Sequence, residues 1–254
     1  MKQNALSALD ARGYTVLDAM AHGGLGRTTH AAPNTFACSD GKTYWVKGRA
    51  QQGLVAELIA GRLADKVGAG PSARVIRVPH ESLPPGGAAD HLEGVVVGLE
   101  DVPNTVNARE LEAILGPGNL PPSGIDGRSR ALVLAFQTWI GVGDTQVLVG
   151  LADGRIYSID HGECFSATSS PSDPSPIVAG IPGLTEDIKK HPGFIRTGIE
   201  RIERLTENDL LIAVAHVPVG GPWQSPADRR LGIANWLANR RGKLREVIEL
   251  WLKS

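Results

Sequence analysis

Residues 155–165 read RIYSIDHGECF, and residues 43–49 read TYWVKGR. The first stretch has the apolar spacing of a short β-strand that ends at Asp160, followed by a tight turn at Gly162. The second is a strand of alternating bulky residues that carries Lys47. A lysine on an early strand can neutralise phosphate oxygens, and an aspartate at the end of a late strand can hold the magnesium that bridges them. Together the two stretches predict a nucleotide-phosphate site.

The overall composition is that of a soluble globular protein. Of the 254 residues 42% are hydrophobic and 21% are charged, which is enough for one large domain or two lobes that share a cleft. The formal net charge of −1 gives no reason to expect contact with nucleic acid or a membrane surface. No apolar run approaches the ~20 residues of a membrane span, and the N-terminus lacks the apolar core of a secretory signal. We therefore expect a cytoplasmic protein.

The two cysteines, Cys38 and Cys164, are far apart in the sequence. The sequence allows a disulfide between them, but two reduced and partly buried thiols are favoured in a cytoplasmic protein.

The first hundred residues read as a β-rich region with one helix. The helix is expected at 53–69, where leucine and valine recur at helical spacing and Gly68 supplies a stop signal. The Asp40-Gly41 pair suits a hairpin turn between two strands. Strands are expected at 14–22, 35–38, 43–49, 72–79 and 93–103.

The rest of the chain reads as mainly helical. Expected here are a short helix at 107–115, an apolar helix at 129–141, a β-hairpin formed by 146–151 and 155–160, and a helical tail from residue 185. This order predicts an α+β, bilobal protein-kinase-like fold with an N-lobe at 1–103 and a C-lobe at 104–254. A generic α+β domain would look the same in outline.

Several residues of the first region are candidates for binding the nucleotide. Lys47 would be costly to bury without a carboxylate or phosphate, and Glu57 on the following helix is the expected partner. An exposed edge-strand lysine and a solvated glutamate are the plainer alternative. Gly24 and Gly26 belong to a glycine-rich turn whose N–H groups would close over phosphates, although such a turn is also an ordinary hairpin tip.

Three residues of the second region are candidates for catalysis and metal binding. Asp144 lies between the apolar helix and the hairpin, where it would accept the proton of a substrate hydroxyl; a loop aspartate that ends a helix is the alternative. Asp160 is the strongest magnesium candidate, because a carboxylate that follows an apolar strand is costly unless it meets a cation. The side-chain oxygen of Gln146 is a second candidate ligand.

These stretches resemble the HipA-like kinases. Residues 44–78, YWVKGRAQQGLVAELIAGRLADKVGAGPSARVIRV, look like the lysine strand, glutamate helix and next strand of that family. Residues 136–165 look like its catalytic loop and its Asp-His-Gly motif, and residues 222–244 look like the helical tail of short members. The resemblance implies a two-lobed fold and transfer of the ATP γ-phosphate to a Ser or Thr hydroxyl on a protein, with ATP and Mg²⁺ bound.

The resemblance also implies a role for each candidate residue. Lys47 would hold the α- and β-phosphates, Glu57 would pair with it, Asp144 would be the base, and Asp160 would bind magnesium. The strand that contains Val97 and Leu99 would lead into the adenine-binding linker.

One departure from the family pattern leaves alternatives open. The sequence Asp144-Thr145-Gln146 runs directly into a strand and offers no asparagine for a second metal. Gln146 would replace that asparagine, or the enzyme would use one metal, or the chain would be a nucleotide-binding pseudokinase that acts as an interaction module. A small-molecule kinase on the same fold is a further alternative. A regulatory partner protein, the oligomeric state and phosphorylation within 166–175 are left open by the sequence.

Overall fold

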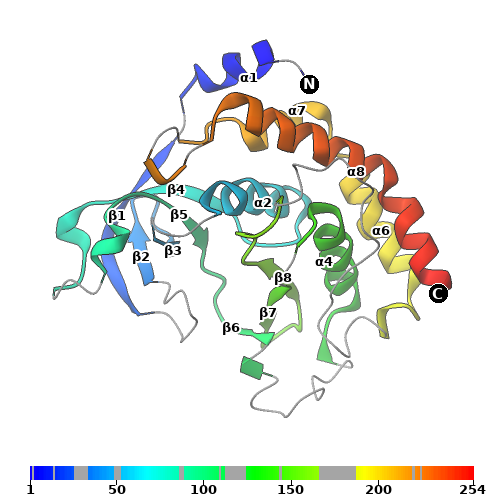
Figure 1. Cartoon of the computed structure of the whole chain (residues 1–254). Helices are drawn as coiled ribbons and strands as arrows, with labels where there is room; N and C mark the ends of the chain where they lie inside the picture. The colour runs from blue at the N-terminus through cyan, green and yellow to red at the C-terminus, as the bar shows by residue number, and fades with distance from the viewer. Residues whose placement is uncertain are drawn as a thin grey trace.

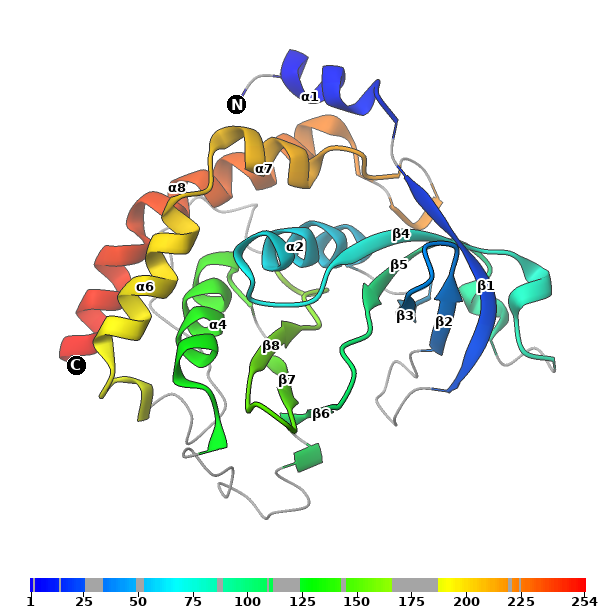
Figure 2. The same ribbon diagram turned by 180° about the vertical axis from the view of Figure 1, so that it is seen from behind.

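The computed structural model describes most of the chain. The described residues are 1, 3–13, 15–25, 34–48, 53–85, 89–108, 110–111, 124–142, 145–165, 187–218, 221–223 and 225–254. They form six α-helices, two β-sheets and short 3-10 helices (Figures 1 and 2).

The N-terminal strands close into a barrel of order β1-β2-β3-β5-β4. The strands are β1 (Val16–Leu25), β2 (Asn34–Cys38), β3 (Thr43–Lys47), β4 (Ala73–Val78) and β5 (Gly94–Glu100). Neighbours pair antiparallel except β1 and β4, whose parallel pairing through Val16–Asp18 closes the barrel. Because strand side chains alternate between faces, Phe36, Tyr44 and Val46 fill the interior.

Helix α2 (Leu54–Val67) lies between the barrel and the C-terminal helices (Figure 1). It contacts β4 and β5 on one side and α7 (Glu207–Val214) on the other. The Arg62 guanidinium donates to the backbone oxygens of Ala213 and Ala215 at 3.0 and 2.7 Å, which satisfies carbonyls at the end of α7. Nearly every residue of α2 up to Ala64 is buried, so the helix is part of a core shared with the helical region.

The second sheet has the order β6-β7-β8 and is antiparallel throughout. Its strands are β6 (Thr105–Asn107), β7 (Gln146–Gly150) and β8 (Ile156–Ile159), and helix α4 (Gly127–Ile140) packs against it. Helices α6 (Pro192–Glu203) and α8 (Ala227–Lys253) cover α4 on its far side (Figure 2).

The N-terminal helix α1 (Gln3–Asp10) lies against α7 and α8 rather than on the barrel (Figure 1). Asp10 forms a two-pronged ion pair with the buried Arg230 at 3.0 and 2.8 Å, and it accepts the backbone N–H of His216. The end of the first helix and the start of the last helix are therefore joined by a charged contact.

The structure confirms most of the elements expected from the sequence and changes three of them. The β-rich region is a closed barrel, which no strand pattern revealed. The hairpin gains a third strand, β6, in a segment where we expected no strand after residue 103. Gly24, expected in the glycine-rich turn, instead belongs to β1 and pairs with Thr35 after a register irregularity. The division of the chain at residue 103 stays a prediction, as does most of the helix at 107–115, which lies outside the described residues.

Both cysteines are free and buried, as expected. Within the described ranges, no helix is long and apolar enough to cross a lipid bilayer.

Candidate active site

Lys47 is the last residue of β3, and its side chain lies on the outer face of the barrel, toward α2. Tyr44 and Val46 point the opposite way, into the barrel. The Lys47 Nζ donates to Glu57 Oε2 and to Asp160 Oδ1, both at 2.5 Å, and the lysine side chain is 15% exposed. The fold therefore brings together three predicted site residues that come from three separate elements.

Glu57 lies in the first turn of α2 and is almost completely buried. Its position depends on Gly53, which precedes the helix with φ +103°. A Cβ on Gly53 would lie 2.0 Å from the carbonyl oxygen of Gly162, so a glycine is needed for α2 to approach the turn after Asp160. That close approach lets Glu57 Oε2 also accept the backbone N–H of His161 at 3.0 Å.

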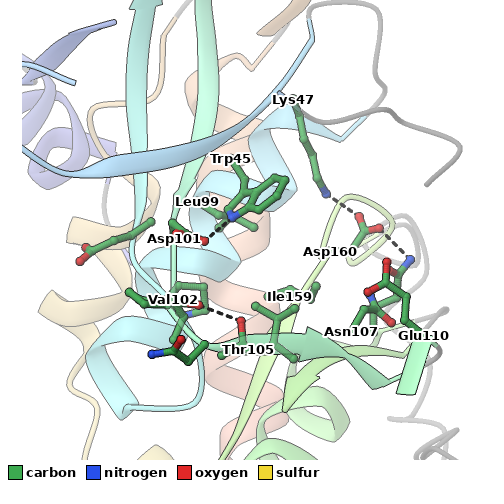
Figure 3. Close-up of a pocket in the computed structure, with 16 residues that line it drawn as sticks. Trp45, Lys47, Leu99, Asp101, Val102, Thr105, Asn107, Glu110, Ile159 and Asp160 are labelled. Atoms are coloured by element: carbon green, nitrogen blue, oxygen red, sulfur yellow. Dashed lines mark hydrogen bonds and ion pairs between the residues drawn. The ribbon is translucent and has the colours of Figure 1, made fainter. Parts of the chain in front are cut away.

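Asp160 directly follows β8 and has φ +58°, a left-handed conformation that aspartate tolerates better than most residues. Its carboxylate points toward Lys47 at the wall of a cavity (Figure 3). Oδ1 accepts from Lys47, and Oδ2 accepts from Gln146 Nε2 at 2.8 Å. The side chain is 38% exposed, so a ligand in the cavity can reach it.

A chain of buried polar groups supports Glu57 from behind. With the amide nitrogen of Gln137 facing Ser158, the Ser158 hydroxyl accepts at 3.0 Å and lies 2.8 Å from His161 Nε2. His161 Nδ1 lies 3.5 Å from Glu57 Oε1. This contact is not a hydrogen bond, so among the described residues the donors that reach Glu57 are Lys47 Nζ and the His161 backbone N–H, both at Oε2.

The surrounding charges fix the ionisation of the central pair. Burial acts to raise the pKa of Glu57, but the Lys47 charge and the contacts with His161 hold that pKa well below its usual range. Burial acts to lower the pKa of Lys47, yet the charges of Glu57 and Asp160 raise it above its ordinary value. At neutral pH the cavity wall therefore carries a permanent cation beside ionised Glu57.

The cavity lies between the barrel and the three-stranded sheet and has a volume of about 320 Å³. Its polar end is formed by Lys47, Gln146 and Asp160, with Asn107 and Glu110 close by (Figure 3). The opposite end is formed by Trp45, Leu99, Asp101 and Val102, and Leu148 and Ile159 of the sheet complete its lining. One end thus suits charged groups and the other suits a flat apolar group.

The remaining predicted site residues fall into two groups. Leu99 lines the cavity, whereas Val97 packs in the core that α2 shares and is not among the described residues of the cavity wall. The two side chains share one face of β5, but the core around α2 encloses Val97. Gly24 belongs to β1, and Gly26 and Asp144 lie outside the described residues, so their roles stay predictions.

Several site residues were not foreseen. Trp45 is two residues before Lys47, and period-two alternation places it on the same face. Asp101 directly follows β5, in the linker that leads to β6. Gln137 is a buried polar residue in a mostly apolar stretch of α4, a pattern that signals a buried hydrogen-bond partner.

The chemistry of the donor set fits a magnesium ion at Asp160. Magnesium is usually bound by one or two carboxylates together with phosphate oxygens and water, and Asp160 presents its carboxylate at the cavity wall. Gln146 faces Asp160 with its amide nitrogen, so its oxygen would bind metal only after the amide turns over. Its assignment as a ligand stays a prediction. Among the described residues, no group of three or more His, Cys, Asp or Glu side chains is arranged to hold a metal.

A barrel lysine that pairs with a helix glutamate, opposite an aspartate at a strand end, is the arrangement of the kinase class of phosphotransferases. Comparison with known families agrees with this class. Residues 25–174, more than half of the chain, match the model of the HipA-like kinase family, so the chain belongs to that family.

Among solved structures, the chain is similar to the Helicobacter pylori proinflammatory kinase CtkA. The identity is 13%, the TM-score is 0.49, and the match covers 86% of this chain and 94% of that one. It is also similar to the Golgi casein kinase solved with Mn and ADP bound, with 11% identity, a TM-score of 0.43, and coverage of 97% and 76% respectively. No curated protein sequence matches the chain.

Proposed function

We propose that the protein transfers the γ-phosphate of ATP to a Ser or Thr hydroxyl of a protein substrate in a Mg²⁺-dependent reaction. The observation that carries this proposal is Lys47, held at 2.5 Å from both Glu57 and Asp160 on the cavity wall. Two carboxylates around one lysine place a fixed cation and an exposed acidic group side by side, which is what a metal-bound triphosphate requires.

In this proposal each site residue has a separate role in the reaction. Lys47 binds phosphate oxygens, and Glu57 keeps the ammonium group in place. Asp160 holds the magnesium, which neutralises phosphate charge. Asp144 accepts the proton of the substrate hydroxyl as the hydroxyl oxygen bonds to the γ-phosphorus and the bond to the β-phosphate oxygen breaks, releasing ADP. Catalysis comes from positioning and charge rather than from a covalent intermediate.

Asp160→Asn tests the proposal, because asparagine also tolerates the left-handed conformation at this position. We expect thermal stabilisation by MgATP in the wild type, and transfer of ³²P from labelled ATP to a Ser/Thr peptide library or to water. The variant should lose about 100-fold or more of this turnover, the usual effect of removing a key electrostatic group. Asp18→Asn, an equal charge change at the exposed ion pair with Arg77, should keep wild-type turnover. Unchanged turnover in Asp160→Asn would refute the assignment.

A nucleotide-binding pseudokinase is the second candidate, and one observation favours it. Strand β7 begins at Gln146, only two residues after Asp144, which leaves no position for a second metal-binding asparagine before the strand. This candidate predicts that MgATP stabilises the wild type, with no transfer to peptides and no hydrolysis. Turnover at an ordinary kinase rate, above about 1 per second, would exclude it.

A further inference from the structure

The end of the cavity away from Lys47 is lined by an aromatic side chain on one side and by aliphatic side chains on the other. Trp45 of β3 lies on the barrel side, and Leu148 and Ile159 of the second sheet lie on the other. The indole N–H of Trp45 donates to Asp101 Oδ1 at 2.6 Å, which fixes the orientation of the indole ring (Figure 3). An aromatic face opposite aliphatic side chains is a platform on which a nucleobase stacks.

Part of the linker backbone at this end is already engaged. The N–H of Glu100 donates to Ser72 at 2.9 Å, and the N–H of Asp101 donates to Thr43 at 2.8 Å. The carbonyl of Val102 accepts the hydroxyl of Thr105 at 2.8 Å. The Val102 carbonyl is therefore already occupied, and the Asp101 carboxylate is a further acceptor at this end of the cavity.

Asp101 presents one carboxylate oxygen as that acceptor. Its Oδ1 is held by Trp45, whereas its Oδ2 accepts no hydrogen bond from any described residue. The carboxylate also lies at the end of the cavity away from Lys47 and Asp160, so it does not face the phosphates (Figure 3). A free carboxylate oxygen accepts hydrogen bonds and repels other acceptors.

We propose that Trp45 and Asp101 select the nucleobase: the Trp45 indole stacks on the purine, and Asp101 Oδ2 accepts a hydrogen bond from its 6-amino group. This inference rests on the proposed use of ATP and adds the residues that recognise the base. Adenine carries an amino donor at position 6, whereas guanine carries an oxygen acceptor there. The carboxylate therefore favours ATP and disfavours GTP.

The experiment is calorimetric titration of ATP, GTP and tripolyphosphate, each with magnesium, into the wild type, Asp101→Asn and Trp45→Leu. Asparagine keeps an oxygen for Trp45 and also offers an amide donor. Asp101→Asn should weaken the binding of ATP about 10- to 100-fold, the usual range for one hydrogen bond to a charged group. It should also reduce the preference for ATP over GTP. Trp45→Leu should weaken the binding of both nucleotides about 5- to 100-fold, because the stacking contact with the base is lost. Tripolyphosphate, which has no base, should bind all three proteins equally.

Asp18→Asn serves as the control and should bind every probe like the wild type, because its ion pair with Arg77 is exposed on the barrel. Wild-type ATP affinity in Asp101→Asn, or an equal loss of ATP and tripolyphosphate, would overturn base selection by Asp101. Tighter ATP binding by Trp45→Leu would overturn the stacking role, since the indole would then occupy the place of the base. These results leave the proposed kinase function standing. A wild type that binds no ATP refutes both proposals.

Discussion

Glu57→Gln removes the charge at the centre of the site while keeping the shape of the side chain. Glu57 is 1% exposed and accepts from Lys47 at 2.5 Å and from the His161 backbone at 3.0 Å. Removing one partner of a buried ion pair typically costs ~3–5 kcal/mol. In the variant the amide oxygen can keep both bonds and Lys47 keeps Asp160, so we expect a lower loss of about 2–3 kcal/mol in the free energy of unfolding.

Urea unfolding at neutral pH measures this loss as a lower midpoint with an unchanged slope. The expected decrease in melting temperature is roughly 4–12 °C for a chain of this size. Glu249→Gln is the matched control, because Glu249 pairs with Arg196 at the surface and such pairs contribute ~0–1 kcal/mol. A loss below about 1 kcal/mol in Glu57→Gln, or an equal loss in both variants, would refute the argument that the buried carboxylate stabilises the fold.

Two further predictions concern the same region. The difference in unfolding free energy between the wild type and Glu57→Gln should shrink as the pH falls from 6 to 3. The folded pKa of Glu57 lies below its ordinary value of 4.5, so the stabilisation by its charge is complete above that value and is lost in acid. A difference that grows in acid would contradict this. Gly53→Ala should lower the unfolding free energy by about 2–4 kcal/mol and reduce turnover, because the added Cβ meets the Gly162 backbone. Gly242→Ala in α8, where a Cβ meets nothing within 4 Å, should instead be neutral or stabilising by up to ~1 kcal/mol, and similar urea midpoints for the two variants would sink the steric argument.

Local patterns in the sequence were enough to locate most elements. The helix expected at 53–69 is α2 at Leu54–Val67, and the apolar helix expected at 129–141 is α4 at Gly127–Ile140. At the start of α7, Thr206 and Asp209, three residues apart in the chain, form a reciprocal pair of capping hydrogen bonds. These features depend on residues close in the chain, so periodicity and capping chemistry reveal them.

The closure of the barrel was not readable in the same way. The parallel pairing of Val16–Asp18 with Val75–Arg77 joins segments about sixty residues apart, and either strand alone has the pattern of an ordinary edge. Strand β6 was missed for a related reason, since three residues carry too little periodicity to identify a strand.

For the site, the kinds of groups and their order could be predicted from the sequence: a strand lysine, a helix glutamate, and an aspartate at the end of a late strand. Only the tertiary structure decided that Lys47, Glu57 and Asp160 meet within hydrogen-bond distance. It also decided which neighbours join them, placing Trp45 and Asp101 in the cavity and Val97 in the core. The physical reason is that residue type and spacing act locally, whereas the distance between residues 47 and 160 depends on how the barrel, α2 and the second sheet pack together.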